Sequence, residues 1–169
     1  MGISAVASSS SSSRIAIALL TLSGAGLVGI ASQENYSAKA YIPVPGDVPT
    51  VGFGSTQGVH MGDTTTPVRA LIRLNNEVEG KYGRAVHDCI TTPLHQNEYD
   101  VFVRLAYNIG PSAFCKSTLV TYANAYEYGK ACGQVVRFIY GPNQIPLKGL
   151  QNLRSEQYLT CVKEPSPNV

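Results

Sequence analysis

An uncharged stretch of 18 residues, 15–32, is the feature that most constrains this chain. Arg14 is the only charged side chain before it, and Glu34 is the first acidic residue of the whole sequence. As a helix, the stretch spans about 27 Å at 1.5 Å per residue, close to the roughly 30 Å hydrocarbon thickness of a bilayer. The stretch is therefore just long enough to cross a membrane.

The hydrophobic gain of this stretch is small. It contains eight strongly apolar residues. At roughly −0.3 to −0.6 kcal/mol each, they favour membrane insertion by a free energy of only about 2.4 to 4.8 kcal/mol. Small and hydroxyl-bearing residues reduce that gain: Thr21, Ser23, Gly24, Gly26 and Gly29. The sequence predicts a weakly hydrophobic anchor over residues 14–32, able to enter a bilayer and to leave it. The positive-inside rule then places a serine-rich tail, residues 1–13, in the cytoplasm and the remainder outside.

Three other interpretations of the stretch compete. A cleavable secretory signal needs a small-residue cleavage site, and residues 38–40, Ala-Lys-Ala, fit the A-x-A pattern. A buried core helix is the second, although a soluble domain seldom opens with a run so free of charge. The third is a dinucleotide-binding G-x-G-x-x-G at residues 24–29. It fails because Asp47, the acid at the required distance, lies in a turn and no βαβ alternation follows.

Length and charge limit the rest of the chain. Its 169 residues fit one domain plus an appendage, and 44% hydrophobic residues suffice for a packed interior. The net charge is only +2, from 13 basic and 11 acidic residues without a Lys/Arg cluster. This argues against a protein that lives by binding nucleic-acid phosphates. We expect one catalytic domain over residues 33–169.

All four cysteines follow the apolar stretch: Cys89, Cys115, Cys132 and Cys161. They contain no C-x-x-C pair, so a zinc site is not expected. An even number predicts two disulfides in an oxidising compartment such as the periplasm, with buried free thiols as the alternative. Sequence alone leaves three connectivities open. We favour Cys115–Cys132 with Cys89–Cys161, because the first pair flanks consecutive helical segments.

Past residue 62 the apolar periodicity is helical. Thr66 is a typical N-cap before a first-turn proline, Pro67, and the apolar face of that helix is predicted as Val68, Leu71, Ile72 and Val78. The clearest pattern follows, closed by Gly110 and carried by Tyr99, Phe102, Val103, Ala106 and Tyr107. Two later segments, over residues 131–139 and 150–161, bring the expected total to four or five helices. Their expected apolar residues are Ala131, Cys132, Val135, Val136 and Ile139 in the first, and Leu150, Leu153, Tyr158 and Cys161 in the second.

Residues 41–59 are different, because prolines and glycines break any helix there. Residues 50–54, Thr-Val-Gly-Phe-Gly, form the one β-like piece. A period of two puts Val51 and Phe53 on one face and Thr50 with two glycines on the other. Bare glycines on one face suggest that something bulky approaches the backbone closely, with a twisted edge strand as the alternative.

Glu34 and this β-like piece together resemble the active-site segment of the phage lysozymes of glycoside hydrolase family 24. The resemblance continues in the same order along the chain and covers about residues 34–161. Its matching pieces are Glu34, Ala40-Tyr41, PTVGFGS at 49–55, YNIG at 107–110, Phe114, STL at 117–119, KGL at 148–150, Arg154 and Glu156. It implies an α+β, mainly α-helical lysozyme fold with a small β-lobe, here preceded by a signal-anchor helix.

In this family a Glu, an Asp and a Thr form the catalytic set. By resemblance, Glu34 is the general acid, and Thr50 helps a carboxylate to hold and deprotonate water on the opposite face of the sugar. Asp47 is the candidate for that carboxylate, although twelve residues separate it from Glu34, more than is usual in the family. Pro43 occupies the usual position of the Asp. The alternative is that Asp47 only forms a turn, which leaves Glu34 with Thr50 as the working core.

Other polar and aromatic residues are expected to lie outside the catalytic set. His60, His87 and His95 are interpreted as surface or capping residues, since none lies in a recognisable nucleophile arrangement. Tyr122, Tyr126 and Tyr128 are the candidates for lining a saccharide cleft, although packing in the core or at a rim is favoured for most tyrosines. Arg154 and Asn108 are expected, by family analogy, to position the substrate or the helices.

The resemblance implies a phage endolysin that cleaves the β-1,4 bond between N-acetylmuramic acid and N-acetylglucosamine in bacterial peptidoglycan. It would act as a monomer without metal or organic cofactor. The apolar stretch resembles that of signal-anchor-release endolysins, which stay inactive in the host inner membrane, facing the periplasm, until the anchor leaves the bilayer. The anchor contains no cysteine, so release would act through refolding alone. A lytic transglycosylase and a non-catalytic, membrane-anchored glycan-binding module are the alternatives.

Overall fold

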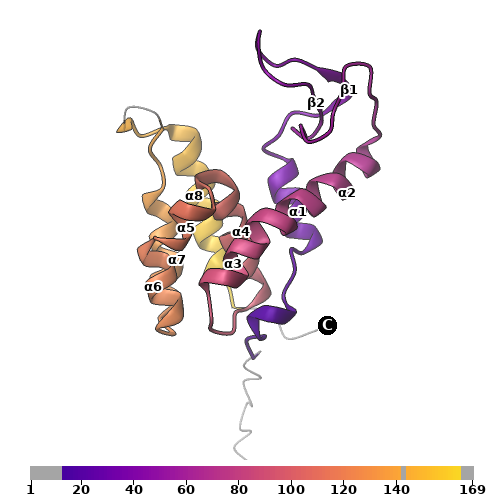
Figure 1. Cartoon of the computed structure of the whole chain (residues 1–169). Helices are drawn as coiled ribbons and strands as arrows, with labels where there is room; N and C mark the ends of the chain where they lie inside the picture. The colour runs from indigo at the N-terminus through magenta and orange to yellow at the C-terminus, as the bar shows by residue number, and fades with distance from the viewer. Residues whose placement is uncertain (1–12, 142–143, 165–169) are drawn as a thin grey trace, which may run out of the picture.

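The computed structural model describes residues 13–141 and 144–164. It is mainly helical with one small two-stranded sheet, which stands at one end of the molecule while most helices gather at the other (Figure 1). This confirms the lysozyme-like architecture expected from the sequence. The elements are η1 (Ile17–Leu19), α1 (Gly24–Ala31), β1 (Ser37–Tyr41), β2 (Thr50–Gly52), α2 (Pro67–Val78), η2 (Glu79–Gly83), α3 (Arg84–Cys89), α4 (Gln96–Ile109), α5 (Pro111–Cys115), α6 (Thr118–Asn124), α7 (Tyr128–Gln134), η3 (Val135–Arg137) and α8 (Lys148–Cys161).

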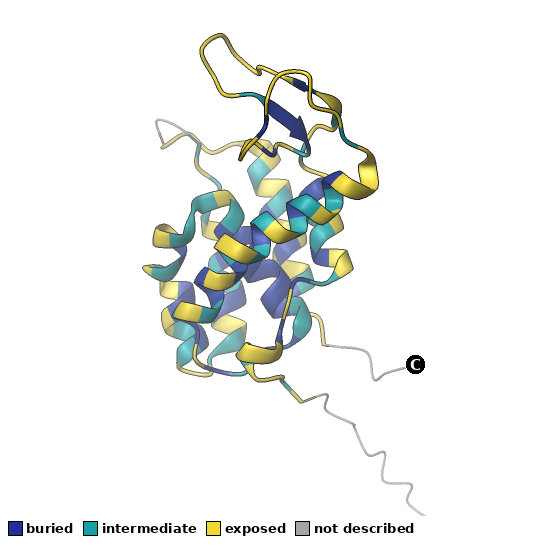
Figure 2. Ribbon diagram, turned by 45° about the vertical axis from the view of Figure 1, so that its right-hand side comes forward, coloured by how far each residue is buried: buried dark blue, intermediate teal, exposed yellow. Residues whose placement is uncertain are grey.

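The described part of the chain thus forms eight α-helices, more than the four or five predicted. Several of them are single-turn or two-turn pieces, which are too short to give a clear apolar period. Helix α4 lies in the middle of the core and is buried from Glu98 to Ala106. Its predicted apolar face and its end at Gly110 are both confirmed. Figure 2 shows the buried residues concentrated where the helices pack together.

The two strands pair antiparallel, with Ser37 opposite Gly52 and an irregularity before the next matched pair. All three residues of β2 are buried, so the predicted bare face of this strand is in fact covered. A Cβ added at Gly52 would lie 2.8 Å from Cβ of Ala70 in α2, and Gly52 has a φ of +66°. The bulky neighbour expected from the glycine pattern is therefore helix α2.

Helix α2 starts as predicted, because the Thr66 hydroxyl accepts a hydrogen bond from the nitrogen of Arg69 at 3.4 Å. Its predicted apolar face is wrong in part. Val68 and Ile72 are 66% and 58% exposed, whereas the buried stripe is Ala70, Leu74 and Val78. The small side chain of Ala70 lets α2 approach the sheet, and this approach decides which stripe is buried.

The last two helical segments also bury different residues from those expected. Helix α7 ends at Gln134, and Val136, predicted to continue its apolar face, is 42% exposed. Helix α8 buries Arg154 and Gln157 together with a cysteine. These two polar side chains can be buried because the Arg154 guanidinium donates a hydrogen bond to the Gln157 side chain at 2.7 Å.

The disulfides join Cys89 to Cys115 and Cys132 to Cys161, so two disulfides are confirmed but the predicted pairing is wrong. Their Cα atoms lie 5.5 and 5.7 Å apart, within the usual range. Helix α5 packs against α3, and α8 packs against α7. Neighbours in space, rather than consecutive helices in the sequence, therefore decide the pairing.

The expected continuous signal-anchor helix is not present in the described residues. Segment 13–32 instead forms η1, a short extended link and α1, with Leu20, Leu22 and Ile30 buried in the main core. Outside a bilayer, these apolar side chains gain most by packing against protein. In residues 13–141 and 144–164, no helix combines the length and hydropathy needed to span a membrane. All but the last residue of the predicted serine-rich tail lies outside the described residues.

Candidate active site

Glu34 follows α1 closely and points at the central helix. Its backbone nitrogen donates to the carbonyl of Ala31 at 3.1 Å, which continues the helical turn for three residues. Its half-buried side chain accepts a hydrogen bond at Oε1 from the phenol of Tyr107, at 2.9 Å. Tyr107 lies in the last turn of α4. The position of Glu34 thus depends on the packing of the N-terminal segment against the core.

The phenol of Tyr107 stays protonated at ordinary pH. Burial raises its pKa, and the hydrogen bond to Glu34 raises the pKa further because a phenolate beside a carboxylate is unfavourable. The ring is supported by Tyr82, with ring centroids 5.1 Å apart and planes nearly perpendicular. Tyr107 therefore presents a fixed hydrogen-bond donor to Glu34.

A cavity of about 450 Å³ lies between the β-lobe, α2 and η2, and is open to solvent. Tyr107 and Gly54 both line it. A Cβ added at Gly54 would lie 3.5 Å from Oε2 of Glu34, so the carboxyl group is bounded by two cavity-lining residues. Gly54 has a φ of +85°, a conformation that favours glycine. The candidate acid is not itself a lining residue, and it adjoins the cavity through Tyr107 and Gly54.

Thr50 is buried at the start of β2, and its hydroxyl donates to the carbonyl of Val48 at 3.2 Å. Asp47 is exposed in the loop between the strands, where its Oδ1 accepts a hydrogen bond from the nitrogen of Val48 at 2.8 Å. The two side chains therefore bind opposite ends of one residue's backbone. Within residues 13–141 and 144–164, no hydrogen bond joins either side chain to Glu34.

The local geometry of Asp47 is that of a turn residue. Its own nitrogen donates to the carbonyl of Val44 at 3.0 Å, which closes the turn before Val48. These two hydrogen bonds fit the alternative in which Asp47 has a structural role. The turn nevertheless leaves the Asp47 carboxylate at the surface, where water has access.

The carboxylate among the lining residues is that of Glu77, a residue that sequence reasoning missed. Glu77 of α2 accepts hydrogen bonds from the hydroxyl of Ser55 at 2.8 Å and from Nε of Arg73 at 3.0 Å. With both oxygens engaged, Glu77 fastens the β-lobe to α2. Tyr107 was also missed as a site residue, because the apolar period of residues 99–107 placed it on the buried face of a helix. The one signal in the sequence was the polar hydroxyl that Tyr107 carries at the end of this apolar face.

Arg154 of α8 and Asn108 of α4 join these two helices. Arg154 donates to the Asn108 side chain at 2.9 Å and to the carbonyl of Phe138 at 3.0 Å. Burial, together with the charge of Arg104, lowers the pKa of Arg154 to about 10. Of the two roles expected for this pair, the contacts indicate the positioning of helices.

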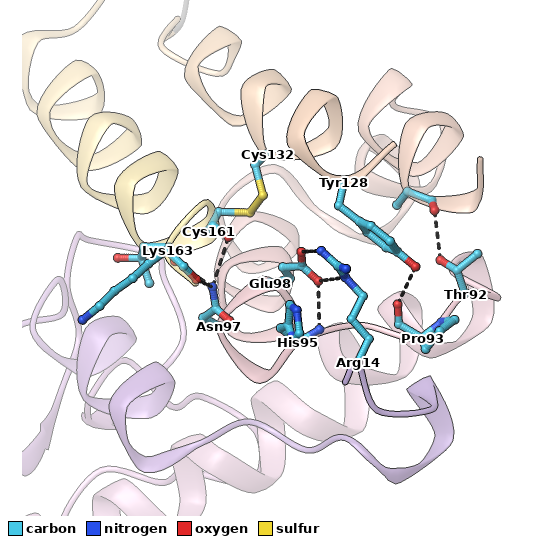
Figure 3. Close-up of polar contacts among 12 residues, drawn as sticks. Arg14, Thr92, Pro93, His95, Asn97, Glu98, Tyr128, Cys132, Cys161 and Lys163 are labelled. Atoms are coloured by element: carbon cyan, nitrogen blue, oxygen red, sulfur yellow. Dashed lines mark hydrogen bonds and ion pairs between the residues drawn. A yellow bond between two sulfur atoms is a disulfide. The ribbon is translucent and has the colours of Figure 1, made fainter. Parts of the chain in front are cut away.

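The histidines follow their predicted roles, with one exception. His95 starts α4 in a capping box, and its nitrogen donates to Glu98 at 2.8 Å, as Figure 3 shows. His60 is exposed. His87 is half-buried, and its Nε2 lies 3.0 Å from the carbonyl of Leu20. It is therefore neither a surface nor a capping residue.

Two of the three candidate tyrosines, Tyr126 and Tyr128, lie at the surface or support the framework. The Tyr128 phenol donates to the carbonyl of Pro93 at 2.8 Å, and Tyr126 is 66% exposed.

In the part of the chain that the structure describes, no group of three or more His, Cys, Asp or Glu side chains could bind a metal ion.

Comparisons with known proteins agree on one family. The family model described as Phage lysozyme matches residues 31–157. A SAR-endolysin of Pseudomonas phage phiKMV is 30% identical over 144 residues, which cover 84% of this chain and 88% of the relative. A P22 lysozyme mutant has a TM-score of 0.76 at 25% identity, covering 86% of this chain and 100% of that one.

The P1 phage endolysin Lyz provides a comparison between two states of one fold. Its active form has a TM-score of 0.71 at 21% identity, covering 89% of this chain and 96% of that chain. Its secreted inactive form has a TM-score of only 0.52 at 18% identity, covering 83% and 94%. The fold described above therefore resembles the active form more closely.

Proposed function

This chain belongs to the phage lysozyme family, whose enzymes lyse peptidoglycan, and we propose that it hydrolyses the β-1,4 bond between N-acetylmuramic acid and N-acetylglucosamine. The observation that carries the proposal is the position of Glu34, hydrogen-bonded to Tyr107 and adjoining Gly54 at the edge of an open cavity. A carboxyl group beside a cavity of this size can reach a glycosidic oxygen of a bound polysaccharide.

In the proposed reaction, the carboxyl of Glu34 donates its proton to the glycosidic oxygen as the bond from that oxygen to C1 breaks. A water molecule adds to C1 from the opposite face and loses a proton to the carboxylate of Asp47. The Thr50 hydroxyl orients this water. Because its hydrogen is donated to the carbonyl of Val48, the Thr50 oxygen is free to accept a hydrogen bond from the water.

Asp47 receives the role of base on two grounds. It is the only acidic residue between Glu34 and Asp63, and its backbone contact with Val48 brings it to the same residue that Thr50 contacts. If Asp47 only forms the turn, Asp47→Asn retains most activity while Thr50→Ala does not.

The experiment compares Glu34→Gln, Asp47→Asn and Thr50→Ala with the unaltered chain on isolated cell walls. We expect Glu34→Gln to lose activity by a factor of at least about 100, the usual contribution of a general acid. New reducing ends indicate hydrolysis, anhydro ends indicate a lytic transglycosylase, and the absence of new ends leaves only glycan binding. Substantial lysis by Glu34→Gln contradicts the proposed mechanism.

Residues 14–32 are proposed to act as a signal anchor that releases from the inner membrane and leaves the enzyme in the periplasm. Three observations support this: the weakly apolar composition, the SAR-endolysin relative at 30% identity, and the closer likeness to the active form of the P1 enzyme. The packed segment described above then corresponds to the released state. A cut at residues 38–40, the alternative cleavage site, would divide β1 and remove Glu34.

Membrane fractionation tests this part of the proposal. Depolarising the host membrane should move the protein from the pellet to the supernatant at unchanged mass. This release of the intact chain would account for host lysis. A soluble form that lacks the N-terminal residues would instead indicate a cleaved signal peptide.

A further inference from the structure

We propose that Tyr107 is a positioning residue for the reaction: its phenol occupies one oxygen of Glu34, so that the other oxygen carries the acidic proton toward the cavity. The inference rests on the proposed function, in which Glu34 is the general acid. It adds the atom from which the proton leaves and the residue that selects that atom.

The selection follows from the hydrogen-bonding capacity of a carboxylic acid. A protonated carboxyl has one O–H donor, and its other oxygen is an acceptor. Oε1 of Glu34 accepts from the phenol of Tyr107 at 2.9 Å. The acidic proton is therefore on Oε2 when both hydrogen positions are satisfied.

Oε2 lies on the side from which substrate would arrive. It is 3.5 Å from the point where a Cβ on Gly54 would stand, and Gly54 lines the cavity. Because glycine has no side chain there, the space next to Oε2 remains open. Tyr107 thus covers Oε1 of the carboxyl, whereas Gly54 leaves Oε2 uncovered.

The phenol is suited to be a permanent donor. Tyr107 belongs to α4, whose preceding turns are fully buried, and the Tyr82 ring supports it from η2. Burial raises the pKa of the phenol, so the hydroxyl keeps its hydrogen through the pH range in which such enzymes act.

The charged groups around this pair are engaged elsewhere. Glu77 of α2 accepts from Ser55 and Arg73, and Lys81 of η2 lies over the Tyr82 ring at 5.1 Å. In residues 13–141 and 144–164, neither Glu77 nor Lys81 forms a hydrogen bond or ion pair with Glu34. Tyr107 is accordingly the partner whose loss changes the hydrogen bonding of that carboxyl.

The test compares Tyr107→Phe with Tyr99→Phe in the soluble, full-length chain. Both variants remove a phenol from the same helix, and both phenols have a pKa that burial raises. Only the Tyr107 phenol contacts Glu34. The substrate is soluble, uncross-linked peptidoglycan strands, for which kcat and KM are measured separately.

For Tyr107→Phe we expect kcat to fall by about tenfold or more, the effect of losing one hydrogen bond to an ionisable group, with KM within about twofold. Tyr99→Phe should keep kcat within about twofold of the unaltered chain. A merely structural role for Tyr107 lowers the yield of folded enzyme, while the folded fraction keeps its kcat.

An unchanged kcat in folded Tyr107→Phe overturns the inference. It leaves the proposed function intact, since that function is judged by Glu34→Gln alone. If Tyr107→Phe does not fold, 4-fluorophenylalanine placed at position 107 decides the question. Its fluorine occupies the place of the hydroxyl without donating a hydrogen bond, so kcat should fall by about tenfold with KM within about twofold, and an unchanged kcat again overturns the inference.

Discussion

The carboxylate of Asp100 accepts hydrogen bonds from both the backbone nitrogen and the hydroxyl of Ser23, the first at 2.9 Å. Ser23 is the N-cap of α1, since its hydroxyl in turn accepts from the nitrogen of Gly26. Helix α1 ends three residues before Glu34. A buried acid of the central helix thereby fixes the start of the helix that leads to the candidate catalytic acid.

Asp100→Asn should lower the free energy of unfolding by about 1–3 kcal/mol, because the amide group can accept only one of the two hydrogen bonds and no longer bears a charge. Urea unfolding followed by circular dichroism measures this. The control is Asp88→Asn, since Asp88 is exposed and, among the described residues, forms only a surface ion pair with Arg84. Equal midpoints for the two variants contradict the prediction.

Arg14→Met should lower the free energy of unfolding by about 1–3 kcal/mol. The guanidinium of Arg14 donates twice to the buried Glu98, at 2.8 and 3.0 Å, and lies 3.6 Å from the Tyr128 ring centroid (Figure 3). Without it, the Glu98 side chain retains only the His95 nitrogen as a donor among the described residues.

The same change also weakens the attachment of the N-terminal segment, because Ile15 next to Arg14 exchanges two backbone hydrogen bonds with Leu94. Arg84→Met serves as the matched control, with an expected effect within about 0.5 kcal/mol. If Arg14→Met unfolds at the denaturant concentration of the unaltered chain, the buried ion pair contributes nothing to stability.

Mass spectrometry of a non-reduced digest should identify peptides joined through Cys89–Cys115 and Cys132–Cys161. Replacing Cys132 and Cys161 together with serine should cost about 3.5 kcal/mol, the chain-entropy value for a loop of this length. Recovery of a peptide that joins Cys115 to Cys132 rules out the arrangement of helices described here.

Alkaline pH should unfold Tyr99→Phe less readily than the unaltered chain. Burial and the charge of Glu79 raise the pKa of Tyr99 above its ordinary value of 10.0. The folded state therefore keeps a proton that the unfolded state releases, so the stabilisation is complete below pH 10 and is lost as pH rises beyond it. Stability measured at about pH 8 and about pH 11 should differ less in the variant than in the parent chain.

Local sequence determined the features that depend on one element at a time. Neighbouring residues determine the apolar period of α4, its end at Gly110 and the start of α2 at Thr66. This is because a helix face and its caps involve positions only three or four apart. The motif around Glu34 and residues 49–55 identified the family in the same way.

Tertiary packing decided the rest. The cysteine pairing depends on which helices meet, and the buried stripe of α2 depends on the approach of Ala70 to Gly52. The apolar stretch can satisfy its side chains in lipid or in a protein core, and hydropathy does not distinguish these two environments. Tyr107 was assigned to a core face by its period, yet its hydroxyl reaches Glu34, 73 positions away, because contacts between distant segments leave no periodic trace in either of them.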